Sequence, residues 1–185
     1  MSAQAGAVAF RSDRTLVGIA LFIASESLFF LGIVIAYVVF REQSLATAKA
    51  HLDVGRTAIF SVLLFASSGT VAVATRRRSP RWLALTALLG GAFLAGQGLE
   101  YARLLGAGLR PGSEMFGTTF FTLTGLHAVH VLVGLVLLVT LFAASAARPR
   151  RVANAAWEGI ALYWHFVDAV WVVVFSVVYL GTIIG

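Results

Sequence analysis

The stretch YWHFVDAVW, residues 163–171, places an imidazole and a carboxylate inside the last of several long apolar runs of this chain. His165 and Asp168 are three residues apart, so a helix would bring both side chains to one face. Each ionisable group at membrane depth costs roughly 2.5 to 3.5 kcal/mol on insertion scales. Two such groups in one apolar segment must therefore face protein, water or each other, which indicates a helix inside a membrane bundle.

The composition of the whole chain is that of an integral membrane protein. Hydrophobic residues make up 59% of the 185 residues and charged residues only 12%, and the mean hydropathy is +0.91. The formal net charge of +6 is typical of basic loops that fix a topology, so we expect no nucleic-acid partner. The sequence contains no cysteine, which excludes disulfides, thiolate catalysis and cysteine metal sites.

Five segments have the roughly 20 apolar residues that a helix needs to cross a hydrocarbon core of about 30 Å. We therefore predict an all-α, polytopic membrane protein with five transmembrane helices in an antiparallel bundle. A cytoplasmic tail, residues 1–14, precedes the membrane domain at 15–184. About nine basic residues fall on the side of this tail and about five on the other, which predicts a cytoplasmic N-terminus and a C-terminus outside. The predicted spans are 15–40, 57–75, 82–105, 116–145 and 157–184.

Several polar side chains fall near the middle of the membrane when about 1.5 Å is counted per residue. They are Glu26 in the first span, His127 and His130 in the fourth, and His165 and Asp168 in the fifth. Glu100 closes the third span near the outer surface. Three interpretations stay open for this layer: a proton path, a metal site built on the three histidines and a carboxylate, or buried hydrogen bonds that lock the helices together.

We favour the buried hydrogen bonds. Two imidazoles at this spacing, without cysteine and with few further donors, are a weak metal signal, so we expect no metal and no catalytic residue. In this hypothesis Glu26 hydrogen-bonds to His127. Asp168 accepts a hydrogen bond from a tryptophan or histidine on its own helix, or bridges to a partner.

The aromatic residues predict packing surfaces. Trp164 and Trp171 are seven residues apart, which returns nearly to one side of a helix, and the row continues into the middle of the membrane. Phe29 and Phe30 follow Glu26 in the first span. We expect these four side chains to pack against a partner subunit or lipid.

Four motifs, taken in order, carry a family resemblance. ASESLFF at 24–30 has the pattern S-E-x-x-F-F, QGLEY at 97–101 has Q-x-x-E-Y, FGTTFF and TGLHAVHV at 116–131 are similar to F/Y-G-S-x-F-F and T-G-F-H-G-x-H-V, and 163–171 has Y-W-H-F-V-D-x-V-W. Together they resemble subunit III of the haem-copper cytochrome c oxidases. The match covers all but the N-terminal tail, with Ala128 standing where that family usually has glycine.

The resemblance implies a five-helix form equivalent to helices three to seven of the longer members, without their first helix pair. It also implies a non-catalytic subunit of a proton-translocating, oxygen-reducing complex in the cytoplasmic membrane of a bacterium. In that family the subunit holds no haem or copper, packs beside the haem-bearing subunit I of a complex that includes the copper-bearing subunit II, and binds phospholipid between its helices. It supports proton uptake and protects the catalytic subunit from inactivation.

Two other classes of protein stay open at this point. An accessory subunit of nitric oxide reductases shares the five-helix plan and a similar W-H-x-V-D ending, although residues 25–30 fit the oxidase pattern better. A small independent proton or solute transporter would show broken helices or two matching halves around a midplane site, and neither is visible in these spans.

Overall fold

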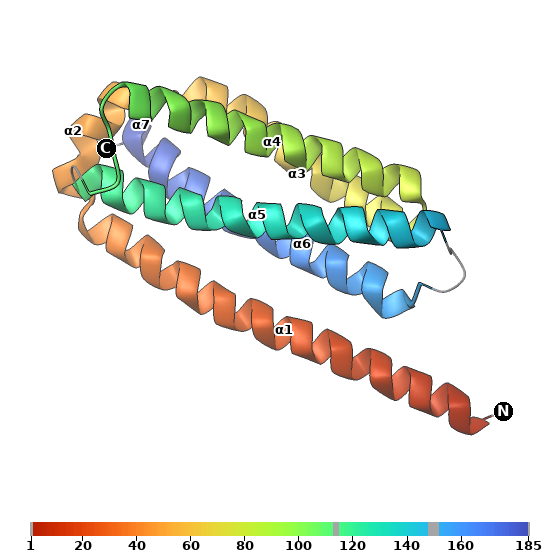
Figure 1. Cartoon of the computed structure of the whole chain (residues 1–185). Coiled ribbons are helices and arrows are strands. Elements are labelled where there is room, and N and C mark those ends of the chain that lie inside the picture. The colour runs from red at the N-terminus through yellow and green to blue at the C-terminus, as the bar shows by residue number, and fades with distance from the viewer. Residues whose placement is uncertain (1, 113–114, 148–151, 185) are drawn as a thin grey trace.

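The structure is a computed structural model that describes residues 2–112, 115–147 and 152–184. Within these ranges the chain is helical and has no strand. Figure 1 shows α3, α4, α5 and α6 side by side in one bundle, with α1 lying along it at a slant. The helices are α1 (Ser2–Val39), α2 (Arg41–His51), α3 (Val54–Arg77), α4 (Pro80–Gly106), α5 (Met115–Ala147), α6 (Asn154–Phe175) and α7 (Gly181–Ile184), with a π-helical turn at Ser176–Leu180.

The prediction of five spans is confirmed. Five helical stretches are long and apolar enough to cross a membrane, namely 16–39, 54–77, 80–106, 115–147 and 154–183. Two features differ from the sequence-based expectation. Helix α1 begins at Ser2, inside the predicted tail, and the predicted connector at 41–56 contains the helix α2. The α2 sequence REQSLATAKAH is rich in strong helix formers but has low hydropathy, so a search for apolar runs does not find it.

Helix α6 is the centre of the bundle. It packs against α1, α3 and α5, and four of its side chains are fully buried: Trp164, Val167, Trp171 and Val174. The short α3–α4 turn explains why neighbouring helices are antiparallel. Arg78 ends α3 in the left-handed conformation with φ of 49°, and Pro80 begins α4, where its missing N–H is not needed.

Candidate functional site

A hydrogen bond joins α1 to α5 in the middle of the bundle. Oε2 of Glu26 lies 3.2 Å from Nε2 of His130, and the imidazole meets the rings of Phe30 and Phe166 at centroid distances of 5.0 and 6.5 Å. The expected bond from Glu26 to His127 is therefore wrong. Three positions along a helix turn by about 300°, so the two histidines point about 60° apart. His130 faces α1, whereas His127 faces α4 and α6.

The Glu26–His130 pair shares one proton. Nδ1 of His130 is 2.9 Å from the carbonyl oxygen of Leu126, and because a carbonyl only accepts, Nδ1 carries a proton. One further proton must lie between Nε2 and the Glu26 carboxyl group, since without it two acceptors would face each other. The pair is either a neutral acid and a neutral imidazole or an ion pair. The hydroxyl of Tyr163 donates to the backbone oxygen of His130 at 3.1 Å, which ties α6 to the same point.

His127 is surrounded by aromatic rings. Its imidazole stacks on Trp171 with ring centroids 4.9 Å apart and planes at 27°, and the ring of Phe93 packs edge-to-face with a centroid distance of 6.0 Å. The side chain is fully buried, and neither ring nitrogen has a hydrogen-bond partner within the described ranges. A buried polar atom without a partner costs about 1–3 kcal/mol. Ring packing against α4 and α6 is therefore what stabilises His127 in this position.

Ser68 of α3 brings together the two polar residues of the 163–171 stretch. Its Oγ lies 3.0 Å from Nδ1 of His165 and donates a hydrogen bond to Oδ2 of Asp168. A hydroxyl has one proton, so once that proton is given to Asp168 the oxygen accepts from Nδ1–H of His165. The shared face expected from the three-residue spacing is present. Asp168 therefore bridges to Ser68 on another helix and does not accept from a tryptophan or histidine of its own helix.

Two more serines of α3 hydrogen-bond to α6. Nε1 of Trp164 donates to Oγ of Ser67, and Nε1 of Trp171 donates to Oγ of Ser61, both at 2.8 Å. Sequence reasoning missed these serines and Ser68. The available signal was the seven-residue spacing from Ser61 to Ser68 inside an apolar run, which returns nearly to one side of a helix.

Trp164 lies between two glycines. A Cβ at Gly90 of α4 would come within 2.6 Å of Cη2 of Trp164, and a Cβ at Gly134 of α5 within 2.8 Å of Cε3 and Cζ3. Both distances are well below the 3.5–4.0 Å of a favourable carbon–carbon contact. The ring therefore needs a glycine on each side.

The four expected packing residues do not form one outer surface. Trp164 and Trp171 are fully buried and Phe30 nearly so, whereas Phe29 is 53% exposed. The expectation of a partner or lipid surface is wrong for the two tryptophans, because they pack inside this chain against α3, α4 and α5. Only Phe29 of the four lies mainly on the outside.

Glu100 is 1% exposed and is bound by a residue that the sequence analysis did not name. Nη2 of Arg103 lies 2.6 Å from Oε1 of Glu100 and also donates to the backbone oxygen of His51 at the end of α2. The backbone N–H of Asp53 points at the same carboxylate oxygen at 3.4 Å. This cluster fastens the α2–α3 turn to α4.

The expected site residues thus form separate groups that each join different helices. Among the residues that the structure describes, no group of three or more histidine, aspartate or glutamate side chains lies close enough to hold a metal ion together. Of the three histidines in the spans, His130 faces α1, His127 lies between α4 and α6, and His165 faces α3. Chemically, the arrangement can hold one proton at the Glu26–His130 pair and connect the helices α1 through α6 by hydrogen bonds.

Comparison with known proteins identifies the family. Residues 58–182 match the family described as cytochrome c oxidase subunit III. A cytochrome c oxidase subunit 3 of Corynebacterium diphtheriae is 34% identical, with 91% of this chain and 89% of that protein covered. A protein of the same name from Synechocystis is 34% identical, covering 91% and 76%, and one from a Bacillus species is 31% identical, covering 91% and 86%. The chain belongs to the cytochrome c oxidase subunit III family.

Proposed function

We propose that this chain is the non-catalytic subunit III of a haem-copper terminal oxidase in the aerobic respiratory chain. It packs beside the haem-bearing subunit I of a complex that also contains the copper-bearing subunit II. There it stabilises the catalytic subunit and supports its proton uptake. The haem and copper belong to those partner subunits.

The observation that carries this proposal is that the polar residues of the family motifs form hydrogen bonds between helices of this chain. Glu26 and His130 join α1 to α5, and Asp168 joins α6 to α3. Glu100 joins α4 to the α2–α3 turn through Arg103. The motif residues thus hydrogen-bond to neighbouring helices of the same chain. This structural use is what we expect of a subunit that supports a catalytic partner.

The proposed location is the cytoplasmic membrane of a bacterium, with the N-terminus in the cytoplasm. The N-terminus and the α3–α4 turn lie at one end of the bundle, and α2 and the C-terminus lie at the other (Figure 1). Four arginines lie in or beside the α3–α4 turn: Arg76 and Arg77 at the end of α3, Arg78 in the turn, and Arg81 at the start of α4. A cytoplasmic position for this basic end follows from the excess of arginine and lysine in cytoplasmic loops.

We further propose that phospholipid binds between the helices. An apolar groove of about 460 Å³ lies between α1, α5 and α6, with Phe22, Val133, Ile160 and Tyr163 in its lining. A groove of this character fits a lipid acyl chain.

Purification from the native membrane in a mild detergent tests the proposal. We expect a tag on this chain to recover haem-bearing partners with oxygen-reducing activity. We also expect an oxidase preparation stripped of this chain to lose activity during turnover faster than the complete complex. Recovery of the chain as a colourless homo-oligomer would contradict the proposal.

A further inference from the structure

His165 is an exposed polar side chain in the membrane-spanning part of α6. It lies 11 residues beyond Asn154, which is about 16 Å along the helix. Its Nδ1–H is used by Ser68, as described above, so in the neutral imidazole Nε2 is a hydrogen-bond acceptor. Nε2 has no partner in the part of the chain that the structure describes. A lipid acyl chain cannot supply the missing donor.

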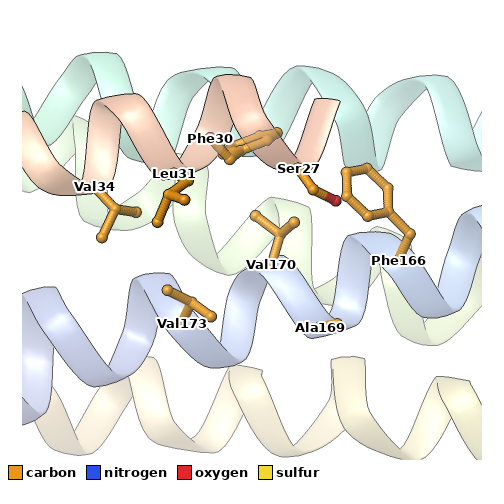
Figure 2. A pocket seen from close by; sticks show the side chains of 8 residues that line it. All are labelled: Ser27, Phe30, Leu31, Val34, Phe166, Ala169, Val170 and Val173. Carbon is orange, nitrogen blue, oxygen red and sulfur yellow. The ribbon is translucent and has the colours of Figure 1, made fainter. Parts of the chain in front are cut away.

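The surface beside His165 is shaped for close approach. Figure 2 shows a groove between α1 and α6 in which Phe30 and Val34 face Val170 and Val173. The groove has a volume of about 300 Å³, and Ala169, one helical turn beyond His165, is part of its lining.

Helix α3 lies on the other side of His165, and its exposed Gly69 follows Ser68, about 100° further around the helix axis. A Cβ at Gly69 would meet nothing within 4 Å. Small residues such as Gly69 and Ala169 let the backbone of another membrane helix come close, and polar side chains hydrogen-bond across such contacts.

We propose that this face of α6 docks a transmembrane helix of the catalytic subunit, and that this helix donates a hydrogen bond to Nε2 of His165. A large apolar side chain of the same helix fills the groove beside Ala169. A protein helix can offer a hydrogen-bond donor to Nε2 of His165, whereas a lipid acyl chain cannot, so we infer a protein helix at this face. This inference rests on the proposed function, which supplies the partner.

A pair of amide variants tests the hydrogen bond. In His165→Asn the amide nitrogen can take the place of Nδ1 and keep the bond to Ser68, but nothing reaches the position of Nε2. In His165→Gln the amide oxygen reaches the position of Nε2 and can accept from the partner. We expect His165→Asn to weaken retention of this chain in the purified complex about three- to ten-fold, and His165→Gln to weaken it less. Equal retention of both variants would overturn the proposal.

The control is Val136→Ala on α5. Val136 is 59% exposed and lies 11 residues before Ala147, so its distance from the α5–α6 end of the bundle matches that of His165. We expect this substitution to leave retention unchanged. A loss as large as that of His165→Asn would overturn the specific role of the His165 face.

Photo-crosslinking provides a test that does not depend on variant stability. A photoreactive residue placed at Ala169 should form an adduct with the haem-bearing subunit in the intact complex, and one placed at Val136 should not. Adducts from Ala169 to lipid only, or equal protein adducts from both positions, would overturn the inference. In those cases haem still co-purifies and the proposed function stands, whereas a wild-type chain that purifies without haem contradicts the proposed function itself.

Discussion

Replacing Gly90 with alanine should destabilise the bundle, whereas the same replacement at the adjacent Gly91 should not. The new Cβ at position 90 would lie 2.6 Å from Cη2 of Trp164, while the one at position 91 would meet nothing within 4 Å. The indole has little room to turn away. Gly134 is packed against another part of the ring, and Nε1 is bonded to Ser67 at 2.8 Å.

The comparison of the two variants isolates the cost of the overlap. Both substitutions gain about the same helix propensity, about 1 kcal/mol in favour of alanine, so this contribution cancels. Overpacking of a filled core costs about 1–3 kcal/mol. If the indole shifts, loss of the Trp164–Ser67 hydrogen bond adds about 1 kcal/mol. We expect the free energy of unfolding of Gly90→Ala to lie about 1–4 kcal/mol below that of Gly91→Ala.

Unfolding of both variants in the same detergent measures this difference. A third variant, Trp164→Phe, removes the part of the indole ring that the added methyl group would meet. In that background the cost of Gly90→Ala should fall by at least about 1 kcal/mol, as a double-mutant cycle would show. Equal stability of the two alanine variants, or an undiminished cost beside Trp164→Phe, would refute the packing explanation.

Three further predictions concern the polar contacts, and unfolding in detergent checks each. His127→Phe should change the free energy of unfolding by less than about 1 kcal/mol, because it keeps a stacked ring and removes two unpaired nitrogens; a loss above 2 kcal/mol would contradict this account. Ser61→Ala should cost about 1–3 kcal/mol, because the buried N–H of Trp171 loses its acceptor, and an unchanged stability would argue against that bond. Glu26→Leu should cost about 1 kcal/mol more than Glu26→Gln, whose amide can still donate to His130; equal losses would show that the pair contributes no net hydrogen bond.

The number and order of the spans could be predicted because a membrane sets a minimum length of apolar helix, and apolar runs of that length can be counted directly in the sequence. Helix α2 has no such constraint. Its helical character comes from Ala46, Ala48 and other helix formers in an otherwise polar segment, so hydropathy alone treats it as a connector.

The candidate site was only partly predictable, because counting residues gives depth but no direction around the helix axis. Glu26, His127 and His130 all count to nearly the same depth. The choice between the two histidines depends on the rotation of α5, which neighbouring helices set. Ser68 was missed for a related reason. It lies about a hundred residues before His165 and Asp168, and only the packing of α3 on α6 brings them together.

The separation of the polar groups bears on how such a subunit could support proton uptake. A proton relay needs a continuous series of groups that can both take up and release a proton. In the described part of the chain, the hydrogen bond that links the Glu26–His130 pair to α6 comes from Tyr163, which donates to the backbone carbonyl of His130. The contacts of Trp164 and Trp171 with α3 use indole N–H groups, which act only as donors. The His165–Ser68–Asp168 group could exchange protons, but within the described residues no hydrogen bond connects it to the Glu26–His130 pair, so the series is not continuous. The geometry therefore favours an indirect role, in which the bundle holds a neighbouring subunit in its working conformation and the protons move elsewhere.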